Sequence, residues 1–335
     1  MNKYLFKKVR SDIKEHYKLY IFYIIIIFIS FFRLNYYIFS PGSLVDLTNR
    51  INVENSYKVD GSFNLTYVTT RHATILTYLL SYVIPNWDLE TIDNMRYDDE
   101  SESEIFERGK ISLKETSYDA VIAAFDEANI PYDIKRIDVT VTHVFDFAKS
   151  DLKVGDIIKK VNNNIINSVE DVSNILKNLN INDEINLEVL RKEKTINCKA
   201  KVVEKDNRKV IGVSISTLKD IETNPKVDFV FENNESGSSR GLMCALDIYN
   251  KITEYDLTKG DIIAGTGTIK SDGTVIEIDG VKYKLMGAVK KGAKVFIVPS
   301  NNYEEALKIK KDNNYDIELI EADNLHNVIK KLESR

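Results

Sequence analysis

ESGSSRGLM, at residues 235–243, joins two apolar segments of different character. The apolar run 227–231 precedes it and the apolar-periodic run 242–252 follows it, which predicts a strand, a tight turn and a helix. A serine in such a turn lies beside the backbone N–H groups of a helix N-terminus, where a nucleophile and an oxyanion hole can be adjacent. The alternative is a loop whose serine only caps the helix, because serine is a preferred N-cap residue.

Composition limits the classes of protein to consider. The chain has 335 residues, of which 43% are hydrophobic, enough for about two domains with real cores. The first 40 residues carry seven Lys/Arg and two acidic residues, a net charge of +5. Because the whole chain has a net charge of −5, residues 41–335 carry −10, and such an acidic body argues against a nucleic-acid partner. Two cysteines and four scattered histidines predict no disulfide framework, metal site or histidine-based triad, and we expect no cofactor.

The N-terminal region predicts a membrane anchor. Residues 19–32 (LYIFYIIIIFISFF) carry no charge, and LNYYIF continues the run after Arg33, whose guanidinium would snorkel to the interface. We therefore expect a transmembrane helix at 19–39, a cytoplasmic basic N-terminus at 1–18, and an extracytoplasmic remainder. A cleaved signal peptide is the alternative, and the absence of a small-residue cleavage site after the run disfavours it.

Residues 40–133 are expected to form the N-terminal part of the ectodomain, associated with the C-terminal domain. Four features are expected after the Ser-Pro-Gly breaker at 40–42: a strand at 61–70, a buried helix at 74–84, an acidic run at 97–104 that is a solvated loop or a helix N-terminus, and an amphipathic helix at 113–128.

The middle of the chain resembles a PDZ domain of the bacterial type. The segment 152–176 reads LKVGDIIKKVNNNIINSVEDVSNIL, in which a Gly-Asp turn leads to a strand, a hairpin and a helix start. Seven residues stand at the matching places: Gly155, Asp156, Ile157, Ile158, Val161, Asn163 and Val169. The resemblance implies a small, partly open β-barrel with two helices at 134–205, which accepts an extended peptide as an added strand.

The last third alternates strands and helices, so the fold class expected for the chain is α+β. Strands are expected at 260–270, 274–278, 295–299 and 317–320, and helices at 281–291, 303–311 and 325–332. A serine nucleophile needs a base, and without a suitable histidine a lysine serves if a dehydrated pocket lowers its pKa. Lys284 lies among apolar residues of 281–291, whereas Lys282 would face another side of the helix. The alternative is that both are solvated surface lysines.

The order of these motifs resembles the Lon-type proteolytic domain: GSSRGL, then Thr266-Gly267, then VIEIDGVKYKL at 275–285. The resemblance implies that Ser239 is the nucleophile, that Lys284 is the general base and that Thr266 orients Lys284. Gly237, Ser238 and Arg240 would form the nucleophile turn and oxyanion region. GTGTIKS at 265–271 is a poor P-loop, because it lacks the glycine before Lys-Ser.

The complete order resembles the YlbL-like membrane-anchored PDZ/Lon-type serine proteases of Gram-positive bacteria, with the proteolytic domain at 206–335. That resemblance implies an ATP-independent endopeptidase that cleaves peptides or membrane-proximal proteins on the extracytoplasmic side through a Ser-Lys dyad. A homo-oligomer is left open. The alternatives are a catalytically weak or inactive PDZ peptide-binding scaffold at the cell surface and a structural membrane protein.

Three residues depart from the Lon pattern. Ser238 replaces a proline, which loosens the turn, and Arg240 replaces an alanine. A cation at Arg240 would either help to keep Lys284 neutral or crowd the cleft. Asp279 replaces the first glycine of a pair, and its carboxylate would raise the pKa of Lys284.

Overall fold

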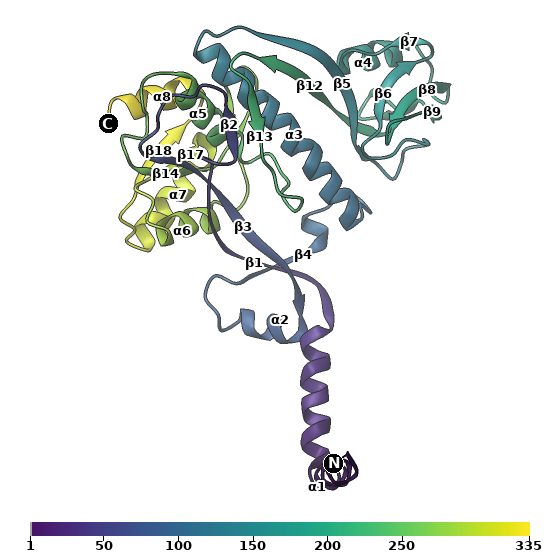
Figure 1. Ribbon diagram of the computed structural model, residues 1–335. Coiled ribbons are helices and arrows are strands. Elements are labelled where there is room, and N and C mark those ends of the chain that lie inside the picture. The colour runs from purple at the N-terminus through teal and green to yellow at the C-terminus, as the bar shows by residue number, and fades with distance from the viewer. Residues whose placement is uncertain (1) are drawn as a thin grey trace. The chain divides into compact units, whose positions relative to one another are not determined.

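The computed structural model describes the backbone of residues 2–335 and the side chains of residues 6–335, so Met1 and the Lys3 side chain of the basic segment lie outside the described part. The chain divides into two compact units (Figure 1). The first comprises Met1–Pro41 and Val68–Asn94, and the second comprises Gly42–Tyr67 and Met95–Arg335.

The predicted transmembrane helix at 19–39 is wrong. Helix α1 (Asn2–Phe31) has a non-helical residue at His16 and ends at Phe31, and the chain continues from Arg33 as strand β1 (Arg33–Asp46). No helix in the described part of the chain has the length and apolar character needed to cross a membrane. The prediction of a single-pass membrane protein with a cytoplasmic N-terminus and extracytoplasmic domains depended on this helix and is therefore also wrong. The breaker expected at 40–42 lies inside β1.

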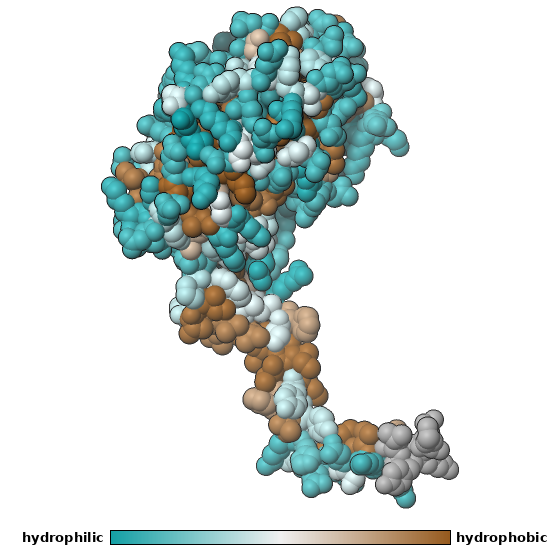
Figure 2. All heavy atoms as spheres, turned by 60° about the vertical axis from the view of Figure 1, so that its left-hand side comes forward, coloured by the Kyte–Doolittle hydropathy of each residue, from teal (hydrophilic) through white to brown (hydrophobic). Residues whose placement is uncertain are grey.

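The rest of the first unit is small. Strand β4 (Asp88–Thr91) pairs antiparallel with β1 and is followed by the 3₁₀ turn η1 (Ile92–Asn94). Helix α2 (Ile75–Ser81) begins at a Thr74 capping box, but none of its residues is buried, so the expectation of a buried helix at 74–84 is wrong. Figure 2 shows the hydrophobic side chains of this unit on its surface.

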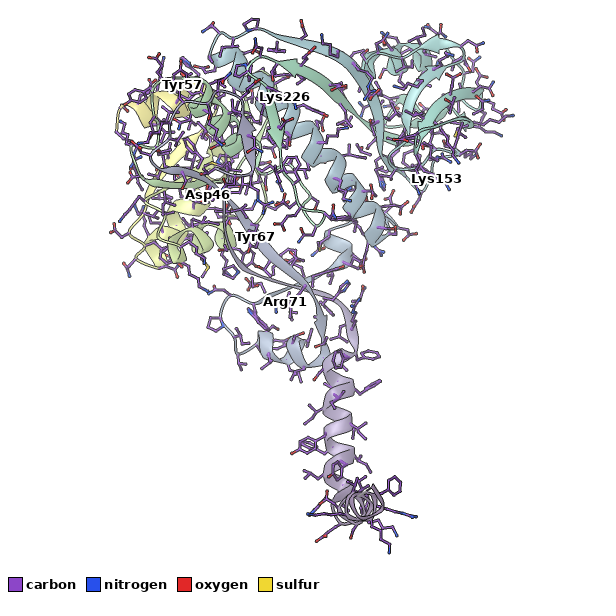
Figure 3. The ribbon with its side chains drawn as sticks, viewed as in Figure 1. Asp46, Tyr57, Tyr67, Arg71, Lys153 and Lys226 are labelled. Carbon is purple, nitrogen blue, oxygen red and sulfur yellow. The ribbon has the colours of Figure 1, made fainter. Side chains whose placement is uncertain are left out.

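A mostly parallel sheet forms the centre of the second unit. Its strands lie in the order β18-β17-β14-β3-β1, and β3, β14, β17 and β18 run parallel. Their bounds are β3 (Ser62–Thr74), β14 (Ile262–Gly265), β17 (Val295–Pro299) and β18 (Glu318–Ala322). Gly42 of β1 lies so close to Tyr67, labelled in Figure 3, that an added Cβ would be 2.1 Å from the Tyr67 carbonyl oxygen.

Helices cover both faces of this sheet, which explains why every residue of β17 is buried. Ile263 and Ile297 belong to a core with α3 (Glu102–Glu127), α5 (Gly241–Ile252) and α8 (Leu325–Glu333). Their neighbours Ala264 and Phe296 belong to a second core with α6 (Val281–Lys290) and α7 (Ser300–Asp312). This alternation follows from the period of two along a strand.

Two short pairings and one helix cap complete the surroundings of the site. Strand β2 (Ile51–Val53) pairs with β13 (Val227–Phe229), and β15 (Thr268–Ile269) forms a hairpin with β16 (Val275–Ile276). Ser101 caps α3 in a capping box with Glu104, so the acidic run at 97–104 leads into a helix N-terminus, one of the two expected outcomes.

A separate sheet with its own core is inserted between α3 and β13. Its order is β12-β5-β6-β8-β9, with β7 on β6. The bounds are β5 (Tyr132–Val144), β6 (Ile157–Val161), β7 (Asn164–Ile165), α4 (Val169–Lys177), β8 (Glu184–Arg191), β9 (Lys194–Lys201), β10 (Val203–Lys205), β11 (Arg208–Val210) and β12 (Val213–Thr223). Within described residues 134–205, α4 is the single helix, whereas two were expected.

Candidate active site

The predicted strand, turn and helix are present around Ser239. Strand β13 ends at Phe229, an irregular segment follows, and α5 begins at Gly241. Gly237 has φ +90°, a left-handed conformation that favours glycine. The N-cap of α5 is Arg240 and has no side-chain cap bond, so the alternative role of a serine that caps the helix is not observed. Ser239 is partly exposed in the turn immediately before α5.

In this turn the carbonyl of Ser239 is hydrogen-bonded, whereas two backbone N–H groups remain available as donors. The Ser239 carbonyl accepts hydrogen bonds from Gly267 N at 2.8 Å and from Thr266 Oγ1 at 3.1 Å. Within the described part of the chain, the backbone N–H groups of Ser239 and Arg240 donate to no acceptor. Two unused N–H groups beside a partly exposed serine are the arrangement that an oxyanion hole requires.

Lys284 lies in the first turn of α6, after Gly280 in the left-handed conformation. Its side chain is 5% exposed, and its Nζ donates to Thr266 Oγ1 at 3.2 Å. Burial lowers the pKa of Lys284 from 10.5 to about 8, while the Asp279 carboxylate acts in the opposite direction and raises it. Lys282 is partly exposed, with its Nζ 5.4 Å from the centre of the Tyr283 ring.

Thr266 connects the two halves of the candidate dyad. It accepts from Lys284 and donates to the carbonyl of Ser239, so the three residues share one hydrogen-bond network. The Ser239 hydroxyl itself has no hydrogen-bond partner among the described residues, and Lys284 does not reach it directly. Catalytic hydrogen bonds are often long in unliganded enzymes and shorten when substrate binds.

The residues that depart from the Lon pattern make contacts of their own. Ser238 Oγ lies 2.8 Å from Thr268 Oγ1, which ties the turn to β15. Arg240 Nη1 lies 3.1 Å from Glu235 Oε2, and its guanidinium stacks over the Phe231 ring at 5.0 Å. The guanidinium therefore faces a carboxylate, and the lowered pKa of Lys284 follows from burial rather than from Arg240.

Sequence reasoning missed the contribution of α3 to this site. The carbonyl of Gly109 accepts from Gly237 N at 2.8 Å, and an added Cβ on Gly241 would lie 2.1 Å from Thr116 Oγ1. These contacts join segments more than 120 residues apart, which no local pattern reveals. The sequence offers one signal, Gly109 within α3, because a glycine inside a helix often allows another segment to pack closely against it.

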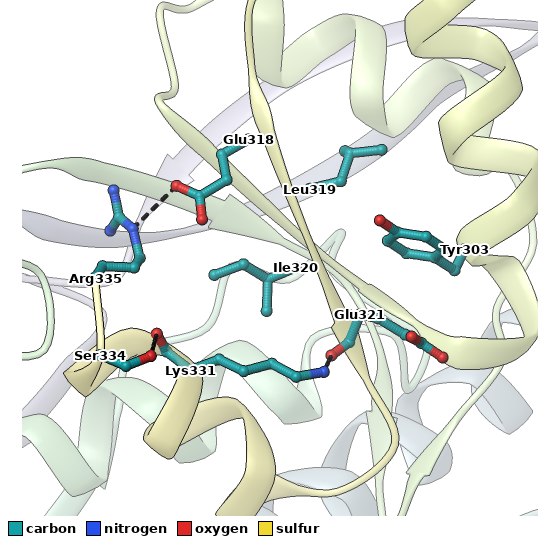
Figure 4. A pocket seen from close by; sticks show the side chains of 8 residues that line it. All are labelled: Tyr303, Glu318, Leu319, Ile320, Glu321, Lys331, Ser334 and Arg335. Carbon is teal, nitrogen blue, oxygen red and sulfur yellow. Dashed lines mark hydrogen bonds and ion pairs between the residues drawn. The ribbon is translucent and has the colours of Figure 1, made fainter.

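Two other features do not take part in the site. Cys244 is fully buried in α5, and burial raises the pKa of its thiol to about 12, which excludes it as a competing nucleophile. A pocket of about 500 Å³ lies beside the edge strand β18, where Arg335 pairs with Glu318 (Figure 4). None of the candidate site residues lines it.

Two parts of the chain match known protein families. Residues 233–334 match the profile of the Lon protease (S16) C-terminal proteolytic domain, and residues 111–202 match that of the PDZ domain. The chain is 30% identical over 96 residues to the peroxisomal Lon protease homolog 2 of Caenorhabditis elegans, and 30% over 99 residues to that of Caenorhabditis briggsae. These matches cover 29% and 30% of this chain and 12% of each relative.

Among solved structures, the PDZ domains of SdrC-like proteins from Listeria monocytogenes and Listeria innocua match at 20% and 17% identity, both with a TM-score of 0.22. Each covers 23% of this chain, and 85% and 92% of the respective domain is covered. The two family matches, to a Lon-type (S16) proteolytic domain at 233–334 and to a PDZ domain at 111–202, are together consistent with a PDZ/Lon-type protease.

Proposed function

We propose that this chain is a serine endopeptidase in which Ser239 and Lys284 act as a dyad. The observation that carries the proposal is the buried Lys284, with a pKa of about 8, hydrogen-bonded to the threonine that holds the Ser239 carbonyl. A lysine with that pKa is substantially neutral near pH 8 and can accept a proton. Its proximity to a partly exposed serine turn is difficult to explain by packing alone, because an unpaired buried lysine is unfavourable.

The proposed reaction has two steps. Ser239 Oγ forms a bond to the peptide carbonyl carbon while Lys284 accepts the hydroxyl proton, and the N–H groups of Ser239 and Arg240 bind the oxyanion. The C–N bond then breaks as Lys284 returns the proton to the amine. Water, deprotonated by Lys284, hydrolyses the acyl-enzyme and regenerates Ser239. No step consumes a nucleotide, so we propose that cleavage does not depend on ATP.

The division of labour is part of the same proposal. Residues 206–335 form the proteolytic domain, residues 40–133 contribute α3 to it, and the PDZ domain at 134–205 binds a peptide or protein substrate as an added strand. Association of copies into a homo-oligomer is a further part of the proposal, and a mass measurement in solution tests it.

A peptide-binding scaffold without activity is the second candidate. The missing hydrogen bond between Ser239 and Lys284 favours it. The test incubates the full chain with a peptide library, with and without ATP, and identifies products by mass spectrometry. Ser239→Ala and Lys284→Ala should abolish products that the native chain forms, while Lys282→Ala, a matched lysine change on α6, should not. If every product of the native chain also forms with Ser239→Ala, the enzyme is rejected and the scaffold remains.

A further inference from the structure

The N–H of Arg240 belongs to a peptide group whose carbonyl is held by two donors. This N–H and the Ser239 carbonyl lie in one planar trans peptide and point in opposite directions, so whatever holds the carbonyl also aims the N–H. The carbonyl accepts from Gly267 N at 2.8 Å and from Thr266 Oγ1 at 3.1 Å, which occupies both of its lone pairs. The Arg240 N–H is therefore directed away from the link between β14 and β15.

Both donors to this carbonyl are themselves fixed. Thr266 is fully buried, and its own N–H donates to the carbonyl of Ile297 in β17 at 3.0 Å. The carbonyl of Gly267 accepts from Leu242 N, in the first turn of α5, at 3.0 Å. Because hydrogen bonds reach a carbonyl oxygen from a broad range of directions, one donor alone would set the peptide plane loosely, and the second narrows it.

The Thr266 hydroxyl joins this peptide to the candidate base. Its single proton is donated to the Ser239 carbonyl, so towards Lys284 it acts as an acceptor, with Nζ at 3.2 Å. In a buried chain of hydrogen bonds each bond polarises the next. A carbonyl that accepts two bonds draws electron density from its amide nitrogen, which makes the Arg240 N–H a stronger donor.

We propose that Thr266 has a second role beside that of holding Lys284: through the Ser239–Arg240 peptide it positions the Arg240 N–H as an oxyanion donor. Thr266 is in this role a positioning residue, because it acts through the peptide and not on the substrate. The inference rests on the proposed peptidase function and deepens it. Since the oxyanion forms only in the transition state, loss of this role weakens the binding of transition-state analogues and leaves the binding of substrate nearly unchanged.

The experiment is done in a chain without Lys284, because Thr266→Val also removes the acceptor of that lysine. The full-length Lys284→Met protein, with and without Thr266→Val, is titrated with a peptide boronate built on a sequence that the native chain cleaves, and with the same peptide ending in an amide. Ser239 Oγ bonds to the boron, the hydroxyl proton leaves to solvent, and the adduct places an anionic oxygen where the oxyanion would lie. We expect Thr266→Val to weaken boronate binding about 10-fold, less than the loss of a whole donor, and amide binding by less than about 2-fold.

Two variants separate positioning from a loss of structure. Thr266→Ser retains the hydroxyl and should restore most of the lost boronate affinity in the same background. Thr140→Val is the matched control, because Thr140 is buried in β5 and its hydroxyl has no hydrogen-bond partner among the described residues. This control should leave the affinities for both ligands unchanged.

The amide resonance of Arg240 in an NMR spectrum gives a second readout that needs no ligand. It should move on Thr266→Val in the Lys284→Met chain and return with Thr266→Ser. An unmoved resonance, or a folded Thr266→Val protein that binds the boronate as tightly as its parent, would overturn the inference and leave the peptidase standing. A native chain that cleaves no peptide and whose Ser239 is not labelled by a serine-reactive phosphonate overturns both.

Discussion

Replacing Lys284 by methionine should abolish cleavage and, near neutral pH, make the protein more stable. The native chain holds this side chain 5% exposed with a pKa of about 8, compared with 10.5 in the unfolded chain. The difference of about 2.5 pKa units corresponds to roughly 3 kcal/mol at pH 7, because one unit is about 1.4 kcal/mol. Methionine fills a similar volume without a charge, and Thr266 Oγ1 keeps its bond to the Ser239 carbonyl.

The gain should depend on pH in a defined direction. Because the folded pKa is below the unfolded one, the unfolded chain binds more protons between about pH 8 and 10.5, and the native protein gains stability as pH rises through that window. The advantage of Lys284→Met should therefore shrink from about 3 kcal/mol at pH 7 to roughly 1 kcal/mol at pH 9.5.

Urea denaturation of both proteins at the two pH values measures this difference, and other titrating groups cancel in the comparison. Lys282→Met, a change of the partly exposed lysine on the same helix, is the matched control, and its effect on stability should be the same at both pH values. A Lys284→Met protein that is less stable than the native one at pH 7, or whose advantage does not change with pH, would show that Lys284 is not a desolvated base.

Three further substitutions test the surroundings of the dyad. Asp279→Asn should move the rise of kcat to lower pH, because Asp279 raises the pKa of Lys284; a shift to higher pH would contradict this. Thr266→Val should lower kcat by about 10- to 100-fold with native secondary structure, since Lys284 loses its acceptor. Gly241→Ala should destabilise the fold by about 1–3 kcal/mol, measured by urea denaturation, and Thr116→Ala in the same chain should restore part of that loss.

Local sequence patterns predicted elements around the candidate site because each has a strong signal of its own. The strand at 295–299 coincides with β17, and the helix expected at 281–291 ends one residue earlier in the structure. An uninterrupted apolar run and an apolar-periodic run ending at Gly292 leave few alternatives. The role of Lys284 remains a prediction that the kinetic experiments test.

The incorrect predictions have a common physical cause: an apolar run in the sequence does not reveal whether its residues form a helix or a strand, or whether they are buried. The apolar residues at 34–39 predict a continued helix, but they lie in β1, where 36–39 pair with β4. Tyr and Ile also favour strands, so the composition fits both structures. The helix at 74–84 was expected to be buried because it is apolar, yet α2 buries none of its residues. Tertiary partners decide both outcomes, and they lie outside any local window.

The topology explains how a lysine and a serine from separate helices converge. Consecutive residues of β14 face opposite sides of the sheet. Ile263 belongs to the core that contains α5, and Ala264 belongs to the core that contains α6, so the two helices cover opposite faces. Thr266 follows directly after the carboxyl end of β14, where crevices form in parallel sheets. From there it contacts Ser239 before α5 and Lys284 in the first turn of α6. A strand end between two helix starts is therefore sufficient to assemble the network, provided that the α3 carbonyl of Gly109 holds the turn through Gly237 N.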